Sequence, residues 1–257
     1  MKIVAVANPK GGVGKTTTTL NLAASLALAD KKVLLLDLDP NAALTSSLGF
    51  ETDSIFTGLY ELFLGTAGWT QAIHHFHLSR LDIVPANVYS SEREARLTAQ
   101  AKNRASLKRK INDAIAKRTL NYDYILMDTP PLMHDLTICA LYAAHSVLIP
   151  FQCGFYALSA VDRMMSMIQR IKEGGNPQLN VTGILINFFE KNTRASQRGA
   201  AEARNKYPDL VFETVIPKNT TIGFAAFEKK PVALVDISAA GSIAFMQLAE
   251  EILSQKQ

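Results

Sequence analysis

Cysteine, tryptophan and long apolar runs are scarce in this sequence, which has 2 Cys and 1 Trp among 257 residues. Cys139 and Cys153 form no C-x-x-C pair and no metal-ligand spacing. The sequence therefore predicts neither a disulfide framework nor a zinc site, and it favours a reducing compartment. The first apolar stretch, residues 3–7, is too short for the core of a signal peptide, and no run is long enough to cross a bilayer. We therefore expect a cytoplasmic protein.

A large excess of one charge is also lacking. The 27 Lys and Arg residues against 23 Asp and Glu residues give a formal net charge of +4. This charge permits an anionic partner but does not require one. With 48% hydrophobic residues, the chain can bury a large core. Because no low-complexity segment or linker divides it, we expect one domain over residues 1–257.

Short apolar runs alternate with longer helical patterns along the chain. Most of the runs are apolar at consecutive positions, as expected for strands buried between two layers of helices. The predicted strands are residues 3–7, 33–36, 81–84, 124–127, 147–149, 183–186 and 211–216. The predicted helical segments are residues 14–29, 91–118, 157–172 and 194–206. This alternation predicts an α/β fold with a doubly wound, mainly parallel sheet flanked by helices on both faces.

A glycine-rich segment, KGGVGKT, follows the first predicted strand and leads into the first predicted helix. This context makes it a strong match to a phosphate-binding loop, with a ligand-free glycine turn as the alternative. The loop N–H groups and the positive end of the helix would face phosphate oxygens. Lys15 would bind the β- and γ-phosphates and the Thr16 hydroxyl would ligate Mg²⁺. The predicted nucleotide-binding residues of the loop are Gly11, Gly12, Val13, Gly14, Lys15, Thr16 and Thr17.

The start of this loop departs from the common pattern, because Pro9 stands in place of the first glycine and Lys10 follows it. With its lysine directly before the glycines, the segment resembles the deviant Walker A motif of the ParA/MinD group of P-loop ATPases. In that group the early lysine reaches the partner subunit's nucleotide, and the resemblance gives this role to Lys10. Two facing ATP molecules would repel each other, so such a cation has a physical purpose. We therefore expect an ATP-dependent homodimer, with an exposed lysine of no consequence as the alternative.

Three aspartates at the ends of predicted strands extend the resemblance. Asp37 and Asp39 lie in VLLLDLDP and Asp128 lies in YDYILMDTPP, at the sheet edge where ligands of such folds bind. The resemblance implies that Asp39 orients the attacking water, that Asp128 holds Mg²⁺ through a water molecule, and that Asp37 supports the metal site from behind. A buried carboxylate without a cation would be costly, although each aspartate alone could merely cap a loop. The predicted catalytic residues are Lys10, Lys15 and Asp39.

Other stretches indicate that the chain is closer to ParA than to MinD. The segments similar to chromosomal and plasmid ParA (Soj) proteins are LDIVPANVYSSEREARL, YDYILMDTPPLMHDLTICALYAAHSVLIPFQCGFYALSAVDRM and ETVIPKN. The resemblance thus covers nearly the whole chain, and it implies that Asn187, Pro217 and Asn219 flank the adenine. It also implies nonspecific binding to double-stranded DNA on the nucleoid, chromosome or plasmid segregation, and slow ATP hydrolysis stimulated by a ParB-like activator protein.

The arginines with which ParA dimers bind DNA are replaced here, as aligned, by Asn192 and Thr221. Two basic groups offer substitutes, because sequence-independent binding to phosphates requires only clustered cations. The first group is Lys102, Arg104, Lys108, Arg109, Lys110, Lys117 and Arg118. The second is Arg194, Arg198, Arg204, Lys206, Lys218, Lys229 and Lys230, with Lys191 nearby. For the first group, the alternative is a solvated helix face whose other side buries Leu107, Ile111 and Ile115. The DNA-binding candidates are Lys102, Arg104, Lys108, Arg109, Lys110, Lys191, Arg194, Arg198 and Lys218.

Two other functions stay open. The replaced arginines agree with an ATPase that positions a protein cargo or acts as a membrane-associated spatial regulator. The last helical pattern carries Glu250 and Glu251 and lacks the basic, bulky character of a membrane-surface helix, so we do not expect membrane binding. A relative of the nitrogenase iron protein would need paired cluster cysteines, whereas the sequence around Cys139 and Cys153 resembles ParA.

Overall fold

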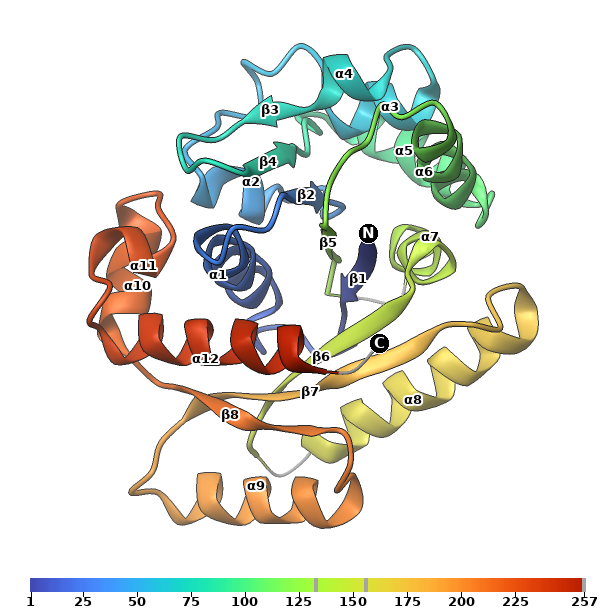
Figure 1. The fold of residues 1–257 in the computed structure, drawn as a ribbon. Helices are drawn as coiled ribbons and strands as arrows, with labels where there is room; N and C mark the ends of the chain where they lie inside the picture. The colour runs from blue at the N-terminus through green and yellow to red at the C-terminus, as the bar shows by residue number, and fades with distance from the viewer. Residues whose placement is uncertain (132–133, 155–156, 256–257) are drawn as a thin grey trace.

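The computed structural model describes residues 1–131, 134–154 and 157–255, and an eight-stranded sheet runs through them (Figure 1). The strand order is β3-β4-β2-β5-β1-β6-β7-β8. Neighbouring strands are parallel except for β3 and β4. The strands are β1 (Lys2–Val6), β2 (Val33–Asp37), β3 (His74–His75), β4 (Leu81–Val84), β5 (Tyr124–Asp128), β6 (Ser146–Gln152), β7 (Asn180–Phe189) and β8 (Val211–Pro217). The predicted doubly wound, mainly parallel sheet is confirmed.

Helices cover both faces of this sheet (Figure 1). They are α1 (Lys15–Leu28), α2 (Ala43–Ser47), α3 (Leu59–Leu64), α4 (Trp69–Ala72), α5 (Ser91–Ala101), α6 (Ser106–Ala116), α7 (Asp135–Ala143), α8 (Ala157–Gly174), α9 (Arg194–Lys206), α10 (Thr220–Phe227), α11 (Val232–Val235) and α12 (Ala240–Ser254). Helices α3 to α9 contribute side chains to one apolar core. Helices α1, α2, α10, α11 and α12 contribute to the other.

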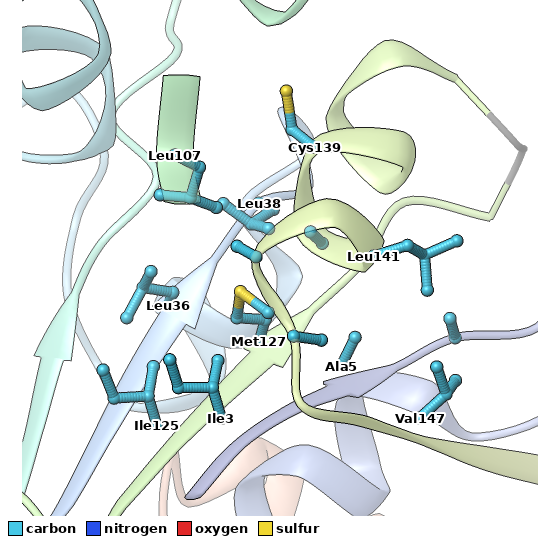
Figure 2. Close-up of a cluster of buried hydrophobic side chains, with 14 of the residues drawn as sticks. Ile3, Ala5, Leu36, Leu38, Leu107, Ile125, Met127, Cys139, Leu141 and Val147 are labelled. Atoms are coloured by element: carbon cyan, nitrogen blue, oxygen red, sulfur yellow. The ribbon is translucent and has the colours of Figure 1, made fainter. Parts of the chain in front are cut away.

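Successive residues of each central strand enter opposite cores, because side chains alternate along a strand. In β1, Ile3 lies in the first core and Val4 in the second. Figure 2 shows the first core, where Leu107 of α6 and Cys139 of α7 lie over the sheet residue Met127. Burial on both faces explains the unbroken apolar runs in the sequence.

The predicted helical segment 91–118 is two helices in the structure. Helix α5 ends at Ala101 and α6 begins at Ser106, with a turn in which the Ser106 N–H donates to Asn103 O at 2.8 Å. Cys139 Sγ donates to Ala101 O at 3.0 Å, which satisfies a carbonyl at the end of α5. The turn redirects the chain, so that the apolar side of α6 packs on α7.

Parallel pairing aligns the carboxyl ends of the central strands. In the register of β2 and β5, Asp37 lies opposite Asp128, and in that of β1 and β5, Val6 lies opposite Asp128. The segment after β1 therefore starts beside two carboxylates contributed by the strands β2 and β5. None of the helices that the structure describes is long and apolar enough to cross a membrane.

Candidate active site

The phosphate loop joins β1 to α1, and two of its glycines have left-handed backbone angles. The φ angles are 73° at Gly12 and 84° at Gly14. A Cβ atom at Gly14 would lie 2.8 Å from Asn187 Nδ2, so this position needs glycine for space as well as for conformation. Helix α1 begins at Lys15 with no side-chain cap and no acidic residue in its first turn. Its N-terminal N–H groups are thus available to phosphate oxygens.

Two buried asparagines hold the loop in place. Asn8 Nδ2 donates to Pro150 O at 2.7 Å, and Asn8 Oδ1 accepts from the Lys10 N–H at 2.8 Å. Asn187, in β7, donates from Nδ2 to Val13 O at 2.9 Å and to the hydroxyl of Thr18 at 3.0 Å. The loop is therefore bound on one side to β6 and on the other to β7.

The side-chain oxygen of Asn187 is buried and has no hydrogen-bond partner among the described residues. An unpaired buried acceptor is unfavourable by about 1–3 kcal/mol. A donor group of a bound ligand, such as the amino group of adenine, would satisfy it, and this agrees with the adenine contact predicted for Asn187. Pro217 and Asn219 lie at the end of β8 and at the N-cap of α10. The adenine contacts of all three residues stay predictions.

Lys15 is buried at the floor of the loop. Burial lowers the pKa of its ammonium group, and the nearby Asp128 and Asp39 oppose that shift. A pocket of about 340 Å³ opens above it, and Lys10, partly exposed, is not among its lining residues. The pocket is lined by Gly12, Gly14, Lys15, Thr16, Thr17, Asp39, Thr129, Pro131 and Phe188. The structure thus brings five of the seven predicted loop residues and Asp39 to one surface, whereas Gly11 and the buried Val13 do not line this pocket.

Asp128 is fully buried beside this pocket. Its carboxylate accepts from the hydroxyls of Thr16, at 2.7 Å, and Thr19, at 3.2 Å. Burial raises its pKa, and the facing carboxyl of Asp37 raises it further. Asp37 is fully buried as well, and burial raises its pKa although it accepts from the N–H and hydroxyl of Thr45 at 2.8 and 2.7 Å.

Two buried carboxylates facing each other fit a divalent cation, which would relieve their repulsion. Mg²⁺ is typically held by one or two carboxylates and by substrate phosphates, so Thr16 and Asp128 would hold it here. The described residues contain no group of three or more His, Cys, Asp and Glu side chains that could hold a metal ion. When bound, the ion would neutralise phosphate charge.

We expect Asp128→Asn to stabilise the nucleotide-free protein, and more strongly at higher pH. Above about pH 4 an aspartate in the unfolded chain ionises freely, whereas the raised pKa of Asp128 in the folded protein opposes ionisation. The free energy of unfolding therefore falls as pH rises toward that raised pKa. Asparagine does not ionise, so the variant does not lose stability in this way. Urea unfolding should show that the difference in free energy of unfolding between variant and parent grows by at least about 1 kcal/mol between about pH 5 and about pH 8.

Asp53→Asn serves as the matched control for this experiment, because Asp53 is exposed. It should leave the pH dependence of the parent protein unchanged. A parent and an Asp128 variant with parallel stability curves would show that Asp128 ionises in the folded state as easily as in the unfolded chain.

Asp39 lies at the edge of the pocket and is oriented by Asn41. The N–H and the side-chain amide of Asn41 both donate to Asp39 Oδ1, at 3.0 and 2.9 Å. The carboxylate is nearly buried and also lines a second pocket of about 330 Å³ with Pro130, Pro131 and His134.

Sequence reasoning missed Asn8, Asn41 and Thr45. Thr45 is fully buried, and its hydroxyl also accepts from the Ala86 N–H at 2.9 Å. The signal for Asn8 was available, because short polar residues next to strand ends often bond the backbone two residues on. By the same rule Asp39 accepts from the Asn41 N–H, but nothing in the sequence indicated that the side chain of Asn41 also donates to Asp39. The signal for Thr45 was absent, since its partners come from β2 and from the segment after β4.

The second basic group lies at the same sheet edge as the phosphate loop. Lys191 and Arg194 follow β7, whose Phe188 lines the phosphate pocket, and Lys218 follows β8. Lys218 Nζ lies 2.9 Å from Glu190, so this cation is already paired. Arg198 is exposed and pairs with Glu202.

The cations of the first basic group diverge. Lys108 Nζ donates to Asn176 Oδ1 at 3.3 Å, whereas Lys110 lines a pocket beside Trp69. Leu107 and Ile111 are fully buried, as expected, but Ile115 is 38% exposed because it lies near the end of α6. The remaining members are exposed; they are Lys102, Arg104, Arg109, Lys117 and Arg118.

Comparisons with known proteins agree with this geometry. Residues 1–181 match the family model described as AAA domain. The chain is 36% identical over 254 residues to the chromosome partitioning protein ParA of Myxococcus xanthus, covering 99% of this chain and 88% of that protein. It is 35% identical over 251 residues to the sporulation initiation inhibitor protein Soj of Bacillus subtilis, covering 98% of each.

Solved structures show the same fold. Cobyrinic acid a,c-diamide synthase from Mycobacterium smegmatis, with bound ADP and magnesium, matches with a TM-score of 0.81 at 31% identity over 98% of this chain and 94% of that chain. The cell division ATPase MinD of Pyrococcus furiosus matches with a TM-score of 0.82 at 25% identity over 99% of both chains. The deviant phosphate loop, the aspartates at the strand ends and the full-length similarity lead to one conclusion: the chain belongs to the ParA/Soj family of P-loop ATPases.

Proposed function

We propose that this chain, as one domain, is a cytoplasmic partition ATPase that hydrolyses ATP with Mg²⁺. Bound ATP closes a homodimer, the dimer binds double-stranded DNA nonspecifically on the nucleoid, and a ParB-like protein stimulates hydrolysis to move a chromosome or plasmid. The observation that carries the proposal is the buried Lys15 between Asp128 and Asp39 beneath a glycine loop. The relative from Myxococcus xanthus, which is named for chromosome partitioning, supports the biological role.

The proposed chemistry is attack of water on the γ-phosphate, in which positioning and charge neutralisation do most of the work. Lys15 and the loop N–H groups hold the phosphates. Thr16 and Asp128 hold the metal ion. Asp39, fixed by Asn41, orients the water, and Lys10 neutralises charge on the partner subunit's nucleotide.

Of the two basic groups, the second supports DNA binding better. Lys191 and Arg194 lie in the segment after β7, next to the nucleotide edge, so a nucleotide-driven change reaches them directly. Lys108 and Lys110 leave α6 in different directions. Because Lys218 is already paired with Glu190, we assign the main phosphate contacts to Lys191 and Arg194.

The double variant Lys191→Glu/Arg194→Glu is expected to weaken ATP-dependent DNA binding by at least about tenfold, because two phosphate contacts are lost and two repulsions gained. Gel retardation of a random-sequence duplex, with ATP and at several salt concentrations, measures the loss. The slope of the logarithm of the binding constant against the logarithm of salt concentration should also decrease, by an amount that corresponds to about two phosphate contacts.

Lys117→Glu/Arg118→Glu is the matched control, because both residues are exposed at the end of the first basic group. It should bind DNA nearly as the parent does. If the parent with ATP retards no DNA even at low salt, the DNA-binding part of the proposal is wrong. If the control pair loses more DNA binding than the test pair, the first basic group and not the second forms the DNA-binding surface.

A further inference from the structure

Helix α10 is an apolar helix that lies almost bare on the surface. Within the helix only Ala225 is buried. The exposed residues after Thr221 are Gly223, Phe224, Ala226 and Phe227. Phe224 is 55% and Phe227 86% exposed. They are three residues apart and so share one side of the helix. Single exposed apolar residues are ordinary, but two aromatic rings on one side of one helix indicate a contact surface.

The rest of the fold fixes which side of α10 faces outward. Asn219 Oδ1 caps the helix by accepting from the N–H groups of Thr221 and Ile222, at 3.0 and 3.3 Å. Ile222 packs closely on Gly241 of α12, where an added Cβ would lie 2.6 Å from Ile222 Cγ1. Ile222 and Ala225 therefore anchor the helix, and the phenylalanines point away from its support. Figure 1 shows α10 at the edge of the molecule, beside α11 and α12.

Two lysines follow α10 closely in the sequence. Lys229 and Lys230 come after the helix and are both exposed, with Glu228 as the acidic neighbour. Lys229 has a left-handed backbone, with φ of 54°, which ends the helix and turns the chain. The exposed rings of α10 are thus followed along the chain by two exposed lysines, and the stem of Lys229 lies against Gly49.

The chemistry of this surface matches an anionic lipid bilayer. Between Gly223 and Phe227 the exposed side chains offer no hydrogen-bond donor or acceptor, so the helix has little with which to recognise a specific polar partner. Aromatic side chains insert at the level of lipid headgroups, and lysines near the surface attract anionic lipids. We propose that α10 is a lipid-docking site in which Phe224 and Phe227 enter the bilayer interface and Lys229 and Lys230 contact anionic headgroups.

Helix α10 is a different segment from the one that led us to expect no membrane binding in the sequence analysis. That expectation rested on the last helix, α12, whose Glu250 and Glu251 do not favour lipid. Lipid docking by α10 goes beyond the proposed function and does not depend on ATP or on dimer formation. A dimer would carry two copies of α10 and bind a surface more tightly by avidity.

Co-sedimentation with vesicles tests the site. The probes are vesicles of equimolar phosphatidylglycerol and phosphatidylcholine, and vesicles of phosphatidylcholine alone, mixed with the purified full-length chain without nucleotide. The parent should bind the anionic vesicles. Phe224→Ser/Phe227→Ser should lower the partition coefficient by about 100-fold, because each ring loses its apolar contact. Lys229→Glu/Lys230→Glu should abolish the preference for anionic vesicles.

Phe56→Ser is the matched control, since Phe56 is 94% exposed in the segment between α2 and α3 and undergoes the same chemical change. It should bind vesicles as the parent does. Circular dichroism and ATP hydrolysis without vesicles, both expected to be unchanged, show that the double variant folds.

Three results would overturn the proposal. The first is a parent that does not bind anionic vesicles, or a double phenylalanine variant that binds them equally well. The second is a concentration-dependent self-association of the parent, without lipid, that the double variant loses, which would assign α10 to a second copy of this chain. The third is a loss of DNA retardation in the double variant without a loss of vesicle binding. Because the vesicle assay needs no nucleotide, failure of the proposed partition function would leave its result unaffected.

Discussion

Replacing Lys15 by methionine is expected to lower the affinity for ATP by at least about 30-fold and to abolish measurable hydrolysis. Methionine keeps an unbranched apolar side chain but removes the ammonium group from the floor of the phosphate pocket. Losing one partner of a buried charge pair costs about 2–5 kcal/mol, and 1.4 kcal/mol corresponds to a factor of ten in affinity. Isothermal titration with ATP and Mg²⁺ measures the loss directly.

The same substitution leaves two nearby carboxylates without their cation. Asp128 and Asp39 both stabilise the charged form of Lys15. Lys15 in turn lowers the pKa of Asp128, so removing the ammonium group should raise that pKa further. Circular dichroism must therefore establish that the variant is folded. Lys117→Met, at an exposed position in the turn after α6, is the matched control and should bind ATP normally. Tight ATP binding by the Lys15 variant would contradict the phosphate role.

The central strands were predictable because burial on both faces leaves a simple pattern. Residues such as Leu34, Leu35 and Leu36 are fully buried in succession, and such runs are typical of parallel strands between helical layers. The short elements α2, α4, α11 and β3 were not predicted. Each has five residues or fewer, which is below the length at which hydrophobic periodicity becomes visible.

Helices α7 and α10 show a different limit of sequence reasoning. Both are largely apolar after their first residues, so neither has the periodic pattern that marks an amphipathic helix. Yet α7 is buried between the sheet and α6, whereas α10 is mostly exposed. The sequence does not distinguish the two cases, because burial depends on which elements pack above each helix.

The candidate site divides in the same way. Lys15, Thr16 and Asp128 could be predicted because a local motif and a strand end place each of them. The support given by Asn8 depends on Pro150, which is 142 residues away. The support given by Thr45 depends on Asp37 and on the segment after β4. Contacts of this kind follow from strand order, which no local pattern specifies.

Replacing Lys10 by alanine is expected to abolish the ATP-dependent dimer while leaving ATP binding by the monomer largely intact. The measurement is best made in an Asp39→Ala background, because that change should stop hydrolysis with ATP still bound and so keep the dimer closed. Multi-angle light scattering with ATP should then report a dimer for Asp39→Ala and a monomer for Lys10→Ala/Asp39→Ala. The dissociation constant of the dimer should rise by at least about 30-fold, as for loss of a buried charge partner.

The two lysines are expected to have different effects, Lys15 on ATP binding and Lys10 on dimer formation, because they lie in different places. Lys15 is buried under its own loop, whereas Lys10 is partly exposed at the loop's start and does not line the pocket. A cation in that position neutralises the monomer's own phosphates little, and it gains its effect when a second nucleotide faces it. Lys10→Arg keeps the charge and should restore dimer formation in part, which a purely structural role would not explain. A dimer of undiminished stability in the double variant would show that some other surface joins the subunits, and a monomeric Asp39→Ala protein with ATP bound would remove the role assigned to Asp39.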